Sequence, residues 1–128
     1  MNTKPCILIA DDAAVLRRMM MAALAATAAE IVEAESGAEG LRLAQARRPD
    51  LILLDVVMPD MDGVETCRRL KADPATADIP VILLSSSETD TLQQAAGLES
   101  GADAYIARPI SNRELVARVE ALLRVKRA

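Results

Sequence analysis

Five short apolar runs alternate with five amphipathic segments along the chain, and this alternation constrains the fold more than any other feature. The apolar runs, rich in Ile, Leu and Val, lie at 5–10, 30–34, 50–55, 79–85 and 103–107. The segments with helical spacing lie at 13–27, 37–47, 63–72, 89–99 and 112–126. Strands that are buried on both faces show continuous apolar runs of this kind. Repeated strand-helix-strand units require right-handed crossovers and a parallel sheet with helices on both faces. The pattern predicts an α/β fold, a three-layer αβα sandwich around a doubly wound five-stranded sheet.

Local signals mark several helix ends. Asp62 with Glu65, and Ser111 with Glu114, each fit a capping box at the start of a predicted helix. Gly101 follows the fourth predicted helix, where glycine commonly ends a helix. These signals place the helix boundaries independently of the apolar pattern.

Composition indicates one domain. The chain has 128 residues, of which 52% are hydrophobic, and this length suits a single core. We expect a domain at 4–123 and a basic tail at 124–128, which would suit the start of a linker helix.

No apolar run approaches the roughly 18 residues of a membrane span, and no secretory signal is visible, so we expect a cytoplasmic protein with no membrane association. The net charge of −4 argues against direct nucleic-acid binding, and both cysteines are expected to be buried, reduced thiols.

Acidic residues follow two of the predicted strands. Asp11 and Asp12 come after the first run, and Asp55 ends the third. The carboxyl edge is where open α/β sheets place their ligands, so the three carboxylates would converge if these strands are neighbours. Clustered anions repel one another, and a hard divalent cation with oxygen ligands would relieve that repulsion. The chain has no histidine, so any phosphohistidine must belong to a partner.

These acids are part of a longer series of motifs at strand ends. The series consists of Asp11-Asp12, Asp55 with Met58-Pro59 and Met61-Asp62-Gly63, Ser85, and Arg108-Pro109. In this order and spacing, the sequence resembles the receiver domain of two-component response regulators from about Lys4 to Leu123. The resemblance implies a flavodoxin-like sheet with the strand order 2-1-3-4-5.

The resemblance also implies a role for each strand-end residue. Asp55 would be the phospho-acceptor, with Ser85 and Arg108 contacting the phosphoryl group. Mg²⁺ would be the cofactor, bound directly by Asp12 and Asp55. Asp11 would bind it mainly through water, and the backbone carbonyl of Val57 would complete the protein ligands.

A conformational switch is implied as well. Ser85 would turn toward the phosphoryl group, and Tyr105 would change rotamer with it. The Arg108-Pro109 bond would be cis. The chain departs from the family pattern at Arg108, where lysine is usual, and at Ser86, where a smaller residue is typical.

The expected function is therefore a phosphorylation-switched signalling module and not a turnover enzyme. Its partners would be a histidine kinase or phosphotransfer protein, and a downstream effector or fused output domain, with a phosphorylation-dependent dimer as a further expected form. The alternative is a pseudo-receiver that binds partners without being phosphorylated, which Arg108 leaves open.

A Mg²⁺-dependent aspartyl phosphohydrolase fits less well because position 57 is Val and not an acid. A flavin-binding electron carrier fits less well because Asp11 and Asp12 would repel its phosphate. Either a stand-alone regulator or a receiver within a longer protein is compatible with the sequence.

Overall fold

A computed structural model describes residues 4–85 and 91–127 of the chain, so Ser86 lies outside the described residues. The strands are β1 Cys6–Ala10, β2 Glu30–Ala34, β3 Leu51–Asp55, β4 Val81–Ser85 and β5 Ala104–Ala107. The helices are α1 Ala14–Leu24, a 3-10 turn η1 Ala25–Thr27, α2 Gly37–Arg47, α3 Gly63–Ala72, α4 Thr91–Glu99 and α5 Asn112–Arg127. Every predicted strand and helix is present.

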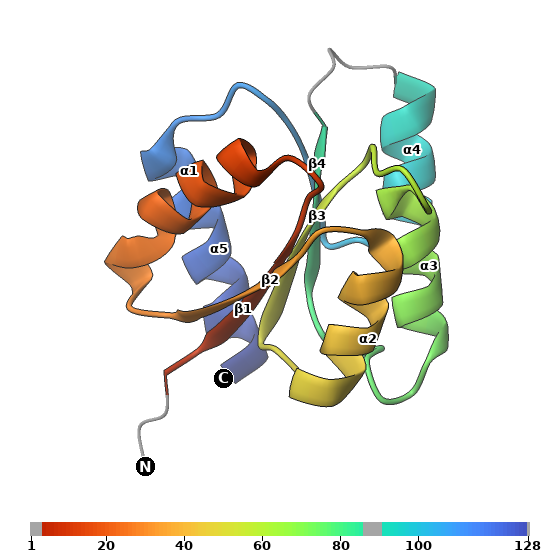
Figure 1. The fold of residues 1–128 in the computed structure, drawn as a ribbon, viewed down its shortest axis with the longest axis horizontal. Coiled ribbons are helices and arrows are strands. Elements are labelled where there is room, and N and C mark those ends of the chain that lie inside the picture. The colour runs from red at the N-terminus through yellow and green to blue at the C-terminus, as the bar shows by residue number, and fades with distance from the viewer. Residues whose placement is uncertain (1–3, 86–90, 128) are drawn as a thin grey trace.

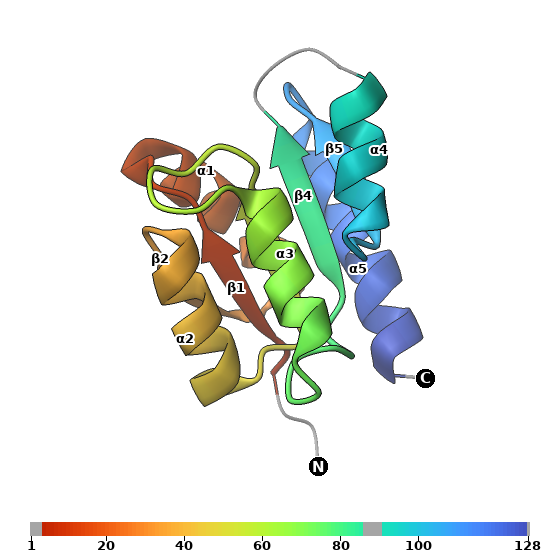
Figure 2. The same cartoon turned by 90° about the vertical axis from the view of Figure 1, so that its right-hand side faces the viewer.

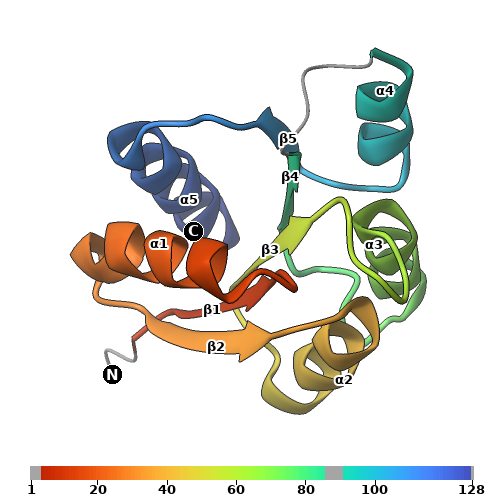
Figure 3. The same ribbon diagram turned by 45° about the horizontal axis from the view of Figure 1, so that its top comes forward.

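The five strands form one parallel sheet in the order β2-β1-β3-β4-β5, which confirms the predicted order. Helices α1 and α5 cover one face, and α2, α3 and α4 cover the other (Figure 1). Seen toward the second face, α2, α3 and α4 lie in front of the strands (Figure 2). With the top of the molecule tilted forward, α1 and α5 lie on one side of the sheet and α2, α3 and α4 on the other (Figure 3). Over the described ranges, no helix combines the length and apolar character needed to cross a membrane.

Alternate strand residues supply two separate cores. In β1, Ile7 and Ile9 point toward α1 and α5, where they pack with Leu24 and Val119. Leu8 points to the opposite core, formed with the helices α2 and α3. Both faces of the strand are therefore buried, which explains why these runs are continuously apolar.

Capping fixes the helix starts. The side chain of Asp62 accepts a hydrogen bond from the Glu65 amide at 2.8 Å, and that of Ser111 accepts one from the Glu114 amide at 3.0 Å. Gly101 follows α4 with a φ of 105°, a left-handed conformation that favours glycine. The sequence predicted these three helix ends correctly, but the carboxylates of Glu65 and Glu114 pair with arginines of their own helices instead of completing a capping box.

The amino edge of the sheet carries two acids, each held by a neighbouring strand. Asp50 precedes β3, and its Oδ2 accepts the Cys6 amide at 2.7 Å while its own amide donates to the Cys6 carbonyl at 2.7 Å. Asp103 precedes β5 and forms the same reciprocal pair with Val81, with both distances 2.8 Å. Lys71 lies 3.5 Å from Asp103 Oδ2. Each of these carboxylates therefore has a defined structural partner.

The two cysteines are free, as expected. Cys67 is buried, but Cys6 is only half-buried because it starts β1 at the amino edge of the sheet.

Candidate functional site

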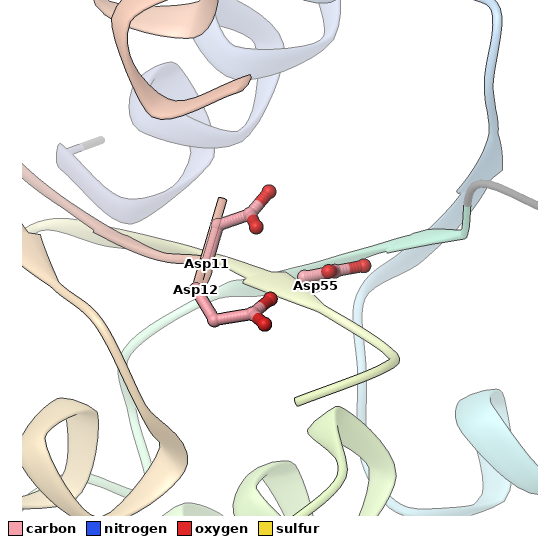
Figure 4. A group of neighbouring side chains, drawn as sticks. All are labelled: Asp11, Asp12 and Asp55. Carbon is pink, nitrogen blue, oxygen red and sulfur yellow. The ribbon is translucent and has the colours of Figure 1, made fainter. Parts of the chain in front are cut away.

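The register of β1 and β3 brings three carboxylates together at the carboxyl edge of the sheet. Ala10 pairs with Leu54, so Asp11 and Asp55 follow side by side. Oxygens of Asp11, Asp12 and Asp55 all lie within 4.8 Å of one another. Figure 4 shows the three side chains extending to the same side of this edge. The convergence predicted from the sequence is therefore present.

The three acids differ in environment. Asp11 is fully buried, Asp12 is exposed, and Asp55 is 7% exposed. Burial first, and the Asp11 carboxylate second, raise the pKa of Asp55 from its ordinary 3.8 to about 6, although Arg108 acts in the opposite direction. The burial of Asp55 and the neighbouring Asp11 carboxylate therefore disfavour the ionised form of Asp55.

Asp11 uses all its polar atoms within the fold. Its amide donates to the Ala34 carbonyl at 3.0 Å, and its Oδ1 accepts the Ala13 amide at 2.9 Å. Its carbonyl accepts a hydrogen bond from Arg17 Nη1 at 2.6 Å, and its Oδ2 accepts one from Arg108 Nη2 at 3.2 Å. Asp11 is therefore a fixed part of the site wall.

Arg108 points into the site from the loop after β5. The Arg108-Pro109 bond is cis, and the Arg108 amide donates to the Ser85 carbonyl at 2.7 Å. Nη1 of Arg108 lies 3.9 Å from Asp55 Oδ1. Among the side chains of the described residues, this Nη1 is a buried nitrogen without a hydrogen-bond partner. Because this buried donor lies beside the Asp55 carboxylate and has no partner, it could bind an anionic group that becomes attached to Asp55.

Close packing fixes the backbone around Asp55. The Val57 amide lies 3.5 Å from Asp55 Oδ1, a long contact, while the Val57 side chain is 65% exposed. A Cβ on Gly63 would overlap the carbonyl oxygen of Asp55, so only glycine lets α3 start this close to β3. Ser85 ends β4, the strand next to β3, and is buried.

Tyr105 lies farther from the acids, in β5. It packs against the core on the α4 side of the sheet, next to Leu83. A Cβ on Gly97 would lie 2.6 Å from Tyr105 Cδ2, so the ring lies directly against the α4 backbone. Gly97 was not identified from the sequence, because a glycine within a helix gives no sign of what packs on it.

Arg17 is the other residue that sequence reasoning missed. It is 7% exposed, and it lies on the buried face of α1 together with Met20, Ala23 and Leu24. An arginine in line with the apolar residues Met20, Ala23 and Leu24 at helical spacing was the available signal.

The donor set suits a hard divalent cation. Carboxylate oxygens are the ligands that such ions prefer, and a cation would relieve the mutual repulsion of the three acids. Asp12 is exposed and Asp55 faces it, so both can offer oxygens, whereas Asp11 is engaged by Ala13 and Arg108.

Comparison with known proteins gives consistent results. The model of the response regulator receiver domain family matches residues 7–120. The chain is 49% identical over 119 residues to the phosphate regulon transcriptional regulatory protein PhoB of Pseudomonas aeruginosa, an alignment that covers 92% of this chain and 51% of PhoB. It is 42% identical over 118 residues to the DNA-binding response regulator MtrA of Mycobacterium tuberculosis, covering 92% and 50% of the two chains.

The fold comparison agrees. The crystal structure of a putative response regulator from Chloroflexus aurantiacus superposes with a TM-score of 0.89 at 33% identity, covering 94% of this chain and 98% of that one. The chain spans about half the length of PhoB and MtrA.

Proposed function

The chain belongs to the response regulator receiver domain family, and on that premise we propose that it is a signalling switch whose phospho-acceptor is Asp55. The donor is a phosphohistidine on a partner histidine kinase or phosphotransfer protein, since this chain contains no histidine. An Asp55 carboxylate oxygen forms a bond to phosphorus while the bond from phosphorus to the imidazole nitrogen breaks. The product is an aspartyl-phosphate on this chain and a free histidine on the partner.

The observation that carries the proposal is the position of the Arg108 guanidinium. Nη2 is held by Asp11, while Nη1 is buried beside Asp55 without a hydrogen-bond partner among the described side chains. A phosphoryl oxygen bound to Asp55 would satisfy this donor. Fixed donors aimed at the transferring oxygens stabilise the charge of the transition state. The inward direction of Arg108 also counts against the pseudo-receiver alternative.

Asp12 and Asp55 are the residues that would hold Mg²⁺, with the Val57 carbonyl as a third protein ligand. Asp11 would act through water, because Ala13 and Arg108 already occupy its two oxygens. When bound, Mg²⁺ supplies positive charge next to the transferring oxygens. Asp55 must be ionised to act as a nucleophile, and a pKa of about 6 leaves it mostly ionised above pH 7.

The partner must reach Asp55, so its docking surface must border the site. A groove of about 310 Å³ lies beside Arg108, between α1 and the start of α5. Its lining is mostly apolar and includes Leu16, Met20, Pro109 and Ile110. Met19, also in the lining, is 61% exposed. We assign this groove to the phosphohistidine-bearing partner.

The output is a change at the surface of α4, β5 and α5. Ser85 and Tyr105 lie in β4 and β5, which are adjacent strands. In the switch, Ser85 turns to the phosphoryl group and Tyr105 moves with it, which alters binding of an effector, a fused output domain or a second copy. Because Gly97 leaves room for the ring, Gly97→Ala is expected to disfavour the inward position of Tyr105.

The primary test is intact mass after incubation with a small phosphodonor and Mg²⁺. The expected result is one phosphate adduct on the wild type and none on Asp55→Asn. The matched control is Asp50→Asn, which changes an acid at the opposite edge of the sheet and should keep the adduct. An adduct of undiminished yield on Asp55→Asn would refute the proposal.

The switch has a built-in probe, since Tyr105 is the only aromatic residue in the chain. Its fluorescence should change when a phosphate mimic such as beryllofluoride is added with Mg²⁺, and much less so in Gly97→Ala. Hydrogen exchange should change over residues 91–115 in the same experiment. An unchanged exchange pattern there would contradict the assigned output surface.

A further inference from the structure

Arg17 is a buried arginine that the proposed chemistry does not use. Its side chain reaches from α1 to two strand ends: Nη1 donates to the Asp11 carbonyl at 2.6 Å, and Nε donates to Glu33 Oε1 at 2.9 Å. Nη2 lies 3.6 Å from Glu35 Oε1. Burial of a guanidinium is unfavourable unless its donors are satisfied, so these contacts hold the group in one place.

The Asp11 carbonyl belongs to the peptide plane that joins Asp11 to Asp12. The peptide unit is planar, so fixing the direction of its oxygen also fixes the start of residue 12. The preceding Asp11 amide is held by Ala34. Arg17 therefore holds one of the two peptide units that flank Asp12, and the Ala13 amide, bound by Asp11 Oδ1, belongs to the other.

Little else fixes this segment on its helix side. Within the described residues, α1 starts at Ala14 without a side-chain cap on Ala13 and without an acid in its first turn. The Ala13 amide is bound by Asp11 Oδ1 and not by a separate capping residue. The link from Arg17 to Asp11, together with the bond from Arg17 to Glu33, connects the helix, the acid pair and β2.

We infer that Arg17 is a positioning residue that directs the Asp12 carboxylate toward Asp55 by holding the Asp11-Asp12 peptide, and that Glu33 and Glu35 hold the guanidinium in turn. The inference rests on the proposed function, because it concerns how the Mg²⁺ ligands are presented. Arg17 itself would touch neither the cation nor the phosphoryl group, because its donors are directed to Asp11, Glu33 and Glu35. Residues that orient a metal ligand in this way typically change metal affinity about 10- to 100-fold when they are replaced.

The test compares Mg²⁺ dissociation constants of the folded, unphosphorylated proteins by NMR titration at fixed ionic strength. Arg17→Met keeps an extended side chain and removes the guanidinium, and it should weaken Mg²⁺ binding about 10-fold. Arg17→Lys keeps the charge but cannot serve the carbonyl and both glutamates, so its loss should be smaller. The matched control is Arg18→Met, since Arg18 is the exposed neighbour on α1 and its loss changes net charge equally.

A second readout needs no metal. Hydrogen exchange at the Ala13 amide, which Asp11 Oδ1 holds, should be faster in Arg17→Met and unchanged in Arg18→Met. A purely structural arginine would lower the melting temperature and leave the Mg²⁺ affinity of the folded protein at the wild-type value. Wild-type affinity in folded Arg17→Met overturns the inference.

If Arg17→Met does not fold, Arg17→Lys and Glu33→Gln decide the question, and wild-type affinity in both overturns it. Wild-type protein that binds no Mg²⁺ and accepts no phosphate would contradict the proposed function. In that event, the Ala13 exchange rate of the metal-free variants would still support or refute the role of Arg17.

Discussion

The two edges of the sheet use the same residue type in opposite ways. At the amino edge, Asp50 and Asp103 each accept an amide of the neighbouring strand and give their own amide in return. At the carboxyl edge, Asp11, Asp12 and Asp55 lie within 4.8 Å of one another, with Arg108 as the cation that contacts Asp11 and Asp55. At the amino edge each carboxylate accepts a hydrogen bond from a neighbouring strand, whereas at the carboxyl edge three carboxylates lie close together.

The contrast separates acids that hold neighbouring strands through hydrogen bonds from the acids to which we assign the proposed chemistry. Strained or poorly compensated groups persist where function needs them. The raised pKa of Asp55, caused first by burial and then by Asp11, is a direct expression of this at the carboxyl edge. Removing an acid should therefore have opposite effects on stability at the two edges.

The largest effect is expected at the amino edge. Asp50→Ala leaves the Cys6 amide without its acceptor and should lower the free energy of unfolding by about 2 kcal/mol. Urea denaturation measures this, with Glu120→Ala on the exposed side of α5 as a control that should stay within about 0.5 kcal/mol. An Asp50→Ala protein as stable as the wild type would show that the acids of the amino edge do not stabilise the fold.

The next effect separates the edges by their response to Mg²⁺. A cation that binds only the folded state stabilises it by about 1.4 kcal/mol at a concentration ten times its dissociation constant. Thermal melts should show this shift in the wild type and in Asp50→Ala, and not in Asp12→Ala. A shift retained in Asp12→Ala would mean that the cation acts elsewhere.

A smaller effect of opposite sign is expected from Asp55→Asn in the absence of Mg²⁺. Because folding raises the pKa of Asp55 from 3.8 to about 6, its contribution to stability is full below pH 3.8 and is lost as pH rises through 6. The shift of about two units sets an upper bound of ~3 kcal/mol, and we expect about 1 kcal/mol because a buried site relaxes around the charge and behaves as a medium of higher effective dielectric constant.

Asp55→Asn should accordingly be the more stable protein at pH 7.5, and the difference should vanish near pH 4. Denaturation at both pH values measures it. Equal stability at pH 7.5 would show that Arg108 fully compensates the charge.

The smallest effect concerns the lifetime of the phosphate. Hydrolysis needs a water held in line with phosphorus, and the Val57 side chain is exposed, has no hydrogen-bonding atom and is stiff. Val57→Asn should speed loss of the phosphoryl group several-fold while Mg²⁺ affinity stays nearly unchanged, because the contact at 57 would use the backbone. Time-resolved intact mass follows the decay. Equal decay rates in the two proteins would show that the Val57 side chain does not control water access, and Arg108 would be the next residue to test.

Most of the fold was predictable because each of its elements carries a local signal. The apolar runs gave the strands, Asp62 and Ser111 marked helix starts, and the acids at strand ends indicated the candidate site. The strand order came from the family resemblance, because apolar runs alone do not determine which strands are neighbours. The contacts of Arg17 and Gly97 could not be predicted, since each joins two different elements whose relative placement the local pattern does not give.

The most direct test of the account is the dependence of phosphorylation on Mg²⁺ and on Asp12. The initial rate of adduct formation with a small phosphodonor is measured by intact mass over a Mg²⁺ titration, for wild type and Asp12→Ala. The account predicts that the wild-type rate rises with Mg²⁺ to saturation, and that Asp12→Ala stays near the metal-free rate. Adduct forming on Asp55 at the same rate with and without Mg²⁺, or equally in both proteins, would contradict it.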